Sequence, residues 1–158
     1  WQFIEIANIK DCTNILEIGS AHGGTLLFWK SLGTNVISLD KKELEGGIPM
    51  SQFGGVHFII SDSSFPEAFS QVSAIMPQID ILFIDGDHSY EGVKSDWEIY
   101  SPLVKTGGLV GFHDTAYGRL RDLEGGGIFS GKVFEEIEGY EKKDIFVHNA
   151  HGIGVVYM

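Results

Sequence analysis

Short apolar runs alternate along the chain with segments in which apolar residues recur every three or four positions. The short runs are typical of buried β-strands and the longer spacing of amphipathic helices. The predicted strands are 13–19, 35–40, 56–61, 79–85, 108–113, 144–148 and 153–158. The predicted helices are 1–10 (the end of a helix), 23–32, 66–76, 90–105 and 132–138. Four apolar residues share one face of the predicted helix 90–105, namely Val93, Trp97, Tyr100 and Val104.

This alternation predicts an α/β fold with a mostly parallel sheet covered by helices on both faces. An open doubly wound sheet fits 158 residues better than a barrel, because a barrel needs eight such units and roughly 250 residues. No repeat, low-complexity tract or linker divides the chain, so residues 1–158 are predicted to form a single domain. The first residue is Trp1 rather than Met, so we expect a fragment or a renumbered chain whose preceding elements are missing.

Composition narrows the classes of partner. The formal net charge is −11, and a field of that sign repels phosphate backbones, so nucleic acid is not expected as a partner. Cys12 is the single cysteine, which excludes an internal disulfide and fits a reducing compartment such as the cytoplasm. No apolar run reaches the roughly 20 residues of a membrane span, and no secretory signal is visible.

In open α/β sheets, ligands bind beyond the carboxyl ends of the strands. The first strand ends in the sequence LEIGSAHGG, residues 16–24, whose spacing G-x-A-x-G-G differs from the G-x-G-x-x-G of dinucleotide-binding folds. Glu17 would repel a pyrophosphate but would suit a ligand that carries an amine or a sulfonium cation. A purely structural turn, in which Glu17 only caps backbone amides, is the alternative.

The second and third predicted strands also end in acids. Asp40 lies 21 residues after Gly19, where an acid can accept hydrogen bonds from two ribose hydroxyls. Taken alone, Asp40 could equally be an exposed loop acid. Asp62 and Ser63 end the third strand, where Asp62 could accept a hydrogen bond from an adenine amino group, cap the following helix, or do both.

Together these motifs carry a resemblance. The segments LEIGSAHGG, VISLD, SDSS and DILFIDGDHSYEGVKSDWEIYSPLVKTGGLVGFHDT resemble a class I S-adenosylmethionine-dependent methyltransferase. More narrowly, they are similar to the family related to cephalosporin-hydroxylase-like and sugar O-methyltransferases. The likeness runs from about Thr13 to the closing GIGVVYM.

The resemblance implies a Rossmann-like sheet of seven strands, the last antiparallel, with S-adenosylmethionine (AdoMet) bound across the first strands. Ala21 stands where many methyltransferases have glycine, which is a small departure. The implied cofactor-binding residues are Glu17, Gly19, Ser20, Ala21, Gly23, Asp40, Lys41, Asp62, Ser63 and Asp85.

The resemblance also implies a second half of the site. In related metal-dependent enzymes, the positions of Asp85, His113 and Asp114 supply ligands to a divalent metal such as Mg²⁺ or Mn²⁺. Such sites usually hold carboxylates or amides, so His113 is a departure that favours Mn²⁺, Fe²⁺ or Zn²⁺, and a site without metal is the alternative. His88 is placed to act as general base, so His88 and Asp85 are the predicted catalytic residues; alternatively, His88 only starts the helix.

Several residues have simpler or open interpretations. Asp87 could ligate the metal, orient His88 or cap the next helix. Asp96 is expected to face solvent, and Trp29 is expected to be buried between a helix and the sheet. The loop 115–127 could act as a lid, with contacts to the acceptor from Tyr117, Arg119 and Arg121.

The function predicted from the sequence is an AdoMet-dependent methyltransferase that acts on a hydroxyl of a small acceptor such as a sugar or glycoconjugate. An NAD-dependent oxidoreductase and a non-catalytic AdoMet-fold partner subunit are the alternatives. The expected partner is a small-molecule substrate, with no membrane and no nucleic acid, and a homo-oligomer is compatible with the sequence.

Overall fold

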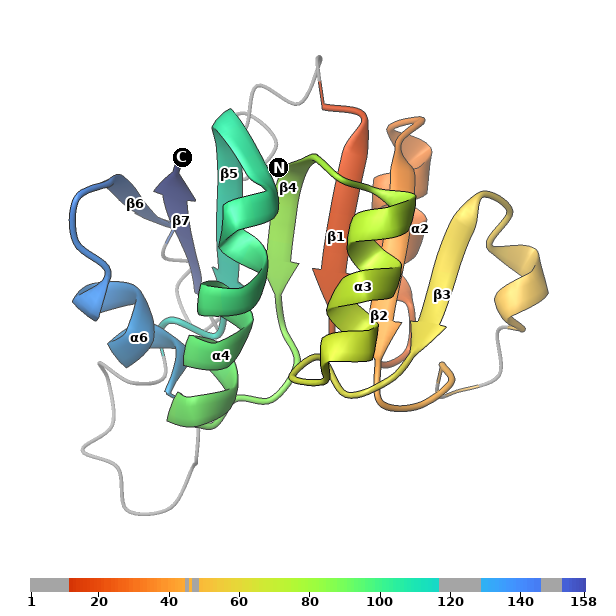
Figure 1. Cartoon of the computed structure of the whole chain (residues 1–158), viewed down its shortest axis with the longest axis horizontal. Coiled ribbons are helices and arrows are strands. Elements are labelled where there is room, and N and C mark those ends of the chain that lie inside the picture. The colour runs from red at the N-terminus through yellow and green to blue at the C-terminus, as the bar shows by residue number, and fades with distance from the viewer. Residues whose placement is uncertain (1–11, 45, 47–48, 117–128, 146–151) are drawn as a thin grey trace.

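The computed structural model describes residues 12–44, 46, 49–116, 129–145 and 152–158. Seven strands form one sheet (Figure 1). The strands are β1 (Asn14–Ile18), β2 (Asn35–Asp40), β3 (Val56–Ile60), β4 (Ile79–Ile84), β5 (Val104–His113), β6 (Glu141–Ile145) and β7 (Ile153–Tyr157). The helices are α2 (Gly24–Ser31), α3 (Pro66–Ile75), α4 (Tyr90–Tyr100), α6 (Ser130–Glu136) and the short 3₁₀ turns η2 (Met50–Gln52) and η3 (Ser101–Leu103).

The strand order is β3-β2-β1-β4-β5-β7-β6. The first five strands of this order pair in parallel, and β7 is antiparallel to both β5 and β6. The predicted open, mostly parallel seven-stranded sheet with an antiparallel last strand is therefore confirmed. Because these five strands are parallel, their carboxyl ends all lie at the lower edge of the sheet in Figure 1. The strand order reverses between β1 and β4, which is where open α/β sheets bind ligands.

Helices cover both faces of the sheet, so adjacent residues of a strand, which point to opposite sides, are both buried. Leu16 of β1 belongs to a core cluster with Val72 of α3 and Val93 of α4. Its neighbour Ile15 belongs to a second cluster with Trp29 of α2. This double burial explains why the strands read as continuous apolar runs, and it confirms that Trp29 is buried, with 2% of its surface exposed.

The helix predicted at 90–105 is shorter in the structure, where it is α4 (Tyr90–Tyr100). It ends at Tyr100, because Pro102 has no amide to donate within the helix, and the chain continues through η3 into β5. The buried positions of α4 are Val93, Asp96 and Tyr100. The prediction that Asp96 faces solvent is therefore wrong, since only 1% of its surface is exposed.

Some predictions fall outside the described residues. These are the helix end at 1–10 and the loop positions Tyr117, Arg119 and Arg121. The edge strand β6 begins at Glu141, three residues before the predicted start, and residues 146–148 of the predicted strand are not described. Among the helices that the structure describes, none has the length and apolar character needed to cross a membrane.

Candidate active site

The turn after β1 is packed between the ends of β2 and β4. The amide of Gly19 donates to the carbonyl of Leu39 at 2.9 Å, and the amide of Asp85 donates to the carbonyl of Ile18 at 2.8 Å. Gly19 has a φ of 84°, and a Cβ at this position would lie 2.3 Å from the backbone oxygen of Asp85. Glycine is therefore required, and it lets the ends of β1 and β4 approach each other closely.

Asp40 at the end of β2 holds the rest of this turn. Its Oδ2 accepts hydrogen bonds from the amides of Ser20 at 2.9 Å and Ala21 at 3.2 Å, and its Oδ1 accepts one from the amide of Lys42 at 3.2 Å. Ala21 has a φ of 43°, which is unusual for a residue other than glycine. The left-handed Gly23 then caps α2. Asp40 therefore holds the turn after β1 in place through its hydrogen bonds to Ser20 and Ala21.

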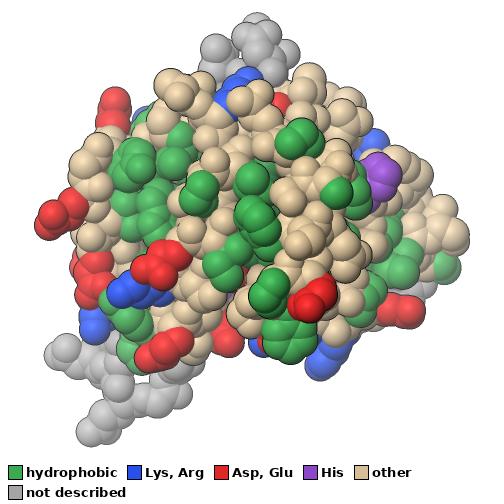
Figure 2. Space-filling view, in the orientation of Figure 1, with side chains coloured by type: hydrophobic (Ala, Val, Ile, Leu, Met, Phe, Trp, Pro, Cys, Tyr) green, Lys and Arg blue, Asp and Glu red, His purple; other side chains and the backbone are tan. Residues whose placement is uncertain are grey.

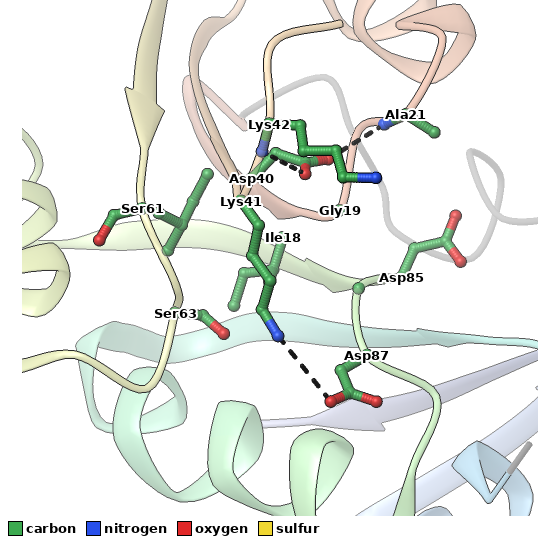
Figure 3. Close-up of a pocket in the computed structure, with 12 residues that line it drawn as sticks. Ile18, Gly19, Ala21, Asp40, Lys41, Lys42, Ser61, Ser63, Asp85 and Asp87 are labelled. Atoms are coloured by element: carbon green, nitrogen blue, oxygen red, sulfur yellow. Dashed lines mark hydrogen bonds and ion pairs between the residues drawn. The ribbon is translucent and has the colours of Figure 1, made fainter. Parts of the chain in front are cut away.

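A pocket of about 340 Å³ lies beyond the ends of these strands (Figure 3). Six of the predicted cofactor-binding residues line it, namely Gly19, Ala21, Asp40, Lys41, Ser63 and Asp85. Asp87, whose role the sequence left open, also lines the pocket. The remaining lining residues were not named by the sequence analysis, namely Ile18, Leu39, Lys42, Ser61 and Gly86. Four predicted residues are not part of the lining, namely Glu17, Ser20, Gly23 and Asp62. The structure thus brings together the ends of β1, β2, β3 and β4 as a single site.

Glu17 is fully buried and lies against α2. Its carboxylate accepts hydrogen bonds from the hydroxyl of Thr25 at 2.6 Å and from the indole of Trp29. Burial outweighs these bonds and raises the pKa of Glu17 to about 7. Its partners are side chains rather than the backbone amides considered from the sequence, and contact with a ligand stays a prediction.

Lys41 extends across the pocket from the end of β2. Its Nζ lies 3.2 Å from Oδ2 of Asp62 and 4.0 Å from Oδ2 of Asp87, the second pair being drawn in Figure 3. Asp62 also accepts hydrogen bonds from the amide and hydroxyl of Ser64 at 2.9 and 2.7 Å, which lower the pKa of Asp62. Because Phe65 is the N-cap of α3, Asp62 caps a turn before the helix rather than the helix itself.

Two acids and two histidines meet where β4 and β5 end side by side. Nδ1 of His113 lies 2.9 Å from Asp85 and 3.2 Å from Asp114. His88 bridges the same carboxylates, with Nε2 3.3 Å from Asp85 and Nδ1 3.3 Å from Asp114. Asp114 is buried and has a φ of 62°, so its side chain is held in a strained backbone conformation. The parallel pairing of β4 with β5 therefore assembles this histidine–aspartate cluster.

The cluster favours positive charge. Burial opposes the charged form of His113, but its hydrogen bonds to Asp114 and Asp85 outweigh burial and raise the pKa of His113 to about 10. The hydrogen bond to Asp85 likewise raises the pKa of His88. Burial alone would raise the pKa of Asp85, but its bonds to His113 and His88 more than offset this, and its pKa is lowered.

Three residues of the cluster have the geometry of a divalent metal site. Asp85, His113 and Asp114 each offer one ligand atom, and these atoms lie within 4.8 Å of one another. Two carboxylate oxygens and an imidazole nitrogen are common ligands of divalent cations. Nδ1 of His113 faces an oxygen of Asp85 at 2.9 Å and one of Asp114 at 3.2 Å, so the three donors converge on one space and the set fits the metal that the resemblance implies.

Asp87 was given three possible roles from the sequence. Its Oδ1 accepts a hydrogen bond from the amide of Ser89 at 2.9 Å, directly before α4. Ser89 is the N-cap of α4 and accepts from the amide of Gly92 at 3.1 Å. These contacts favour the helix-start role for Asp87, and its second oxygen faces Lys41.

One buried acid behind the pocket, Asp96, was assigned to solvent by sequence reasoning. A charged residue one position before Trp97 is normally placed outside the apolar face of its helix. The signal that could have placed it is its spacing, since Val93, Asp96 and Tyr100 are separated by three and four residues and so share one helix face.

Comparisons with known proteins agree with this architecture. A family model described as "Methyltransferase domain" matches residues 16–115. This range runs from β1 to just beyond β5, so it contains both the glycine turn and the histidine–aspartate cluster.

Two curated relatives have been found. An uncharacterized protein of Acanthamoeba polyphaga mimivirus is 34% identical over 116 residues, which cover 66% of this chain and 52% of that protein. A rhamnosyl O-methyltransferase of Mycobacterium leprae (strain TN) is 24% identical over 157 residues, covering 90% of this chain and 65% of that enzyme. The chain thus spans between half and two thirds of the length of these relatives.

Solved structures share the fold at low identity. An O-methyltransferase from Bacillus cereus in complex with SAH has a TM-score of 0.70 at 16% identity, covering 98% of this chain and 78% of that one. MycE, a methyltransferase of mycinamycin biosynthesis in complex with Mg, SAH and mycinamycin VI, has a TM-score of 0.68 at 20% identity, covering 99% and 48%. CalS11, a TDP-rhamnose 3′-O-methyltransferase, has a TM-score of 0.66 at 14% identity, covering 99% and 77%. These structures share the fold, and the family model that matches residues 16–115 shows that the chain belongs to the methyltransferase domain family.

Proposed function

We propose that the protein is an AdoMet-dependent O-methyltransferase whose acceptor is a small hydroxylated molecule, such as a sugar or glycoconjugate. One observation carries this proposal. Asp85 lines the ligand pocket and also belongs to the histidine–aspartate cluster. A cofactor in the pocket and a hydroxyl at the cluster would therefore be neighbours, as direct transfer between them requires.

The pocket suits the cofactor. When bound, AdoMet would supply a methyl group made electrophilic by its sulfonium. Asp40 ends β2, where its carboxylate would accept hydrogen bonds from the ribose hydroxyls. Ser63 and Lys41 line the part of the pocket nearest β3, where an adenine would lie. The complexes of MycE and the Bacillus cereus enzyme with SAH support this assignment.

The cluster suits activation of a hydroxyl. Asp85, His113 and Asp114 would hold a divalent cation, which supplies an electrostatic field that lowers the pKa of a bound hydroxyl. His88 lies 3.3 Å from both Asp85 and Asp114; with these carboxylates engaged as metal ligands, His88 would be neutral, with one ring nitrogen able to accept the hydroxyl proton. The Mg present in the MycE complex supports the metal.

The acceptor class rests on the relatives. A rhamnosyl O-methyltransferase is among the relatives in sequence, and a TDP-rhamnose 3′-O-methyltransferase is among those in structure. A sugar offers neighbouring hydroxyls that can bind one cation together, and Mg²⁺ held by three protein ligands would take its remaining ligands from water or substrate oxygens.

Binding of the cofactor can be tested by thermal shift. AdoMet at millimolar concentration should raise the Tm of the wild-type protein, because a ligand that binds only the folded state stabilises it. Asp40→Ala should remove most of this shift, whereas Glu141→Ala, an exposed change on the edge strand β6, should keep it. A wild-type protein that is folded but shows no shift would contradict the proposal.

Turnover can be tested by methyl transfer to a panel of sugars, nucleotide sugars and catechols, with and without a chelator. We expect chelation to abolish transfer and Mg²⁺ or Mn²⁺ to restore it. His88→Gln should lower kcat by roughly 10²–10⁴-fold, the usual contribution of a general base, with AdoMet binding intact. Full activity after exhaustive chelation would refute the metal role of Asp85, His113 and Asp114.

The alternatives predict different results in the same assays. The relatives and structures described above whose activity is named are methyltransferases, and the NAD-dependent alternative would require binding of NADH. A non-catalytic partner subunit would bind AdoMet without turnover. A cytoplasmic location and a homo-oligomer stay predictions, which fractionation and light scattering would test.

A further inference from the structure

The two outer strands of the sheet differ in how their edges are protected. Most residues of the outer strand β6 are charged, namely Glu141, Lys142, Lys143 and Asp144. The outer strand β3 has the sequence VHFII, with no charge, no proline and an uninterrupted register with β2. Edge strands of natural proteins are normally protected by charges, prolines or bulges, because their unpaired backbone groups can capture another strand. The edge of β6 is protected in this way, and the edge of β3 is not.

The backbone of β3 has donors that point away from the sheet. The amide of Ser61 donates to the carbonyl of Asp40 at 2.8 Å, so Ser61 and every second residue before it face β2. The N–H and C=O of one strand residue point to the same side, so those of Val56, Phe58 and Ile60 face outward. The amide of Val56 is already bonded within the turn before β3. In the part of the chain that the structure describes, β2 is the only strand paired with β3, which leaves Phe58 and Ile60 as the outward donors.

The region around β3 also lacks the charge that keeps two copies of this chain apart. With a net charge of −11, two copies repel each other wherever their acidic faces meet. Residues 46–79, which span β3 and α3, include only Asp62 and Glu67 as charged residues, although the whole chain has 11 Lys and Arg and 22 Asp and Glu. On the face shown in Figure 2, charged side chains gather over α4 and α6 and are sparse over α3. The same region exposes large apolar side chains, namely Ile60, Phe65 and Ile75.

We propose that β3 pairs antiparallel with β3 of a second copy of this chain, so that the two sheets join across a two-fold axis. A register centred on Phe58 overlaps the whole of both strands and sets Val56 opposite Ile60 of the second copy. Each Phe58 then exchanges both backbone bonds with its counterpart, and each Ile60 amide donates to the carbonyl of the opposite Val56. No charged side chain lies opposite another in this register, so the pairing uses every outward donor without electrostatic cost.

A second copy is the partner that this edge fits best. An interface around a two-fold axis uses the same surface of both copies, so one pairing covers both open edges and assembly stops at two chains. The charges on β6 oppose further pairing at the other edge of each sheet. This inference does not rest on the proposed function, because Val56, Phe58 and Ile60 neither line the pocket nor belong to the histidine–aspartate cluster. Its failure would therefore leave the proposed function untouched.

Light scattering over a range of protein concentrations tests the pairing. The mass of the wild-type protein should rise from that of one chain, 17.4 kDa, toward twice this value. Ile60→Lys should raise the dissociation constant roughly tenfold or more, because it sets two buried ammonium groups into one interface. Leu27→Lys makes the same chemical change on α2, at a residue that is 50% exposed compared with 46% for Ile60. This control should associate like the wild-type protein.

Residue-resolved amide exchange on the wild-type protein tests the register and needs no variant to fold. On association, the outward amides of Phe58 and Ile60 should exchange about tenfold more slowly or less, while those of His57 and Ile59, which face β2, should be protected throughout. A wild-type protein that stays monomeric at every concentration would overturn the inference. A dimer that Ile60→Lys leaves intact, or whose formation does not slow exchange at Phe58 and Ile60, would also overturn it, because its interface would lie elsewhere.

Discussion

At the scale of single residues, the buried carboxylate of Glu17 on β1 makes the stability of the protein depend on pH. Burial raises the pKa of Glu17 from 4.5 to about 7 in the folded protein. Between these values, the folded state holds a proton that the unfolded state has released. The free energy of unfolding therefore falls as the pH rises through this window.

We expect Glu17→Gln to flatten this pH dependence. From pH 5 to pH 8, the wild-type protein should lose about 2 to 3 kcal/mol more than the variant, since one pKa unit corresponds to roughly 1.4 kcal/mol. Urea denaturation at several pH values would measure this, with the exposed Glu98→Gln as control. Parallel curves for wild type and Glu17→Gln would show that the buried carboxylate does not carry the effect.

Sequence reasoning worked best for residues placed by strand ends. Asp40, Ser63 and Asp85 follow directly from the rule that ligands bind beyond the strand carboxyl ends, and all three line the pocket. It worked less well where the direction of a side chain decides the role. The inward orientation of Glu17 depends on its contact with Trp29 of α2, and the burial of Asp96 depends on the packing of α4 against the sheet.

At the scale of elements, the close approach of β1 and β4 depends on the turn that follows β1. Gly19→Ala would place a methyl group 2.3 Å from the backbone oxygen of Asp85, in a backbone conformation with positive φ. The strand ends must separate to accept it. We expect a loss of more than about 2 kcal/mol of stability, together with loss of AdoMet binding, because the turn lines the pocket.

Two other glycines serve as controls in the same Tm and binding measurements. Gly33 has a φ of 76° but open space around its Cβ position, so Gly33→Ala isolates the backbone strain, about 1 kcal/mol. Gly24 begins α2 with open space and no unusual φ, so Gly24→Ala should be neutral or stabilising. If Gly19→Ala costs no more than Gly33→Ala, the contact with Asp85 is not the limiting feature.

The elements themselves were largely predictable, and their ends were less so. The apolar runs located the five parallel strands and β7 in chain order, whereas the polar edge strand β6 begins three residues before its predicted start. The end of α4 was misplaced because apolar periodicity continues to Val104, while the backbone geometry at Pro102 stops the helix four residues earlier, at Tyr100. The family resemblance supplied the number of strands and the antiparallel last strand, and the structure supplies their pairing order, because long-range pairing leaves little local signal.

At the scale of the whole molecule, the net charge of −11 sets the field around the pocket. Figure 2 shows one face, on which charged side chains lie between and around several separate groups of apolar ones. AdoMet carries one more positive charge than SAH, because only AdoMet has the sulfonium. An acidic protein should therefore attract AdoMet from a distance more strongly than SAH.

Salt should weaken this attraction. Raising the ionic strength from about 20 mM to about 500 mM shortens the screening length from roughly 20 Å to below 5 Å. We expect the Kd of AdoMet to rise about threefold more than the Kd of SAH over this range, as measured by calorimetry. Equal salt dependence of the two ligands would show that the net charge plays no part in cofactor binding.

The position of β1 between β2 and β4 also has a consequence for the synthesis of the chain. The amide of Asn14 donates to Asp80, a residue 66 positions later, and at translation speeds of about 5–20 residues per second β4 emerges roughly 3 to 13 seconds after β1. During this interval, β1 can pair with β2 but has one edge open to other chains. A ribosome that pauses before Ile84 would therefore leave one edge of an apolar strand unpaired, and prompt arrival of β4 protects the nascent protein from misassembly.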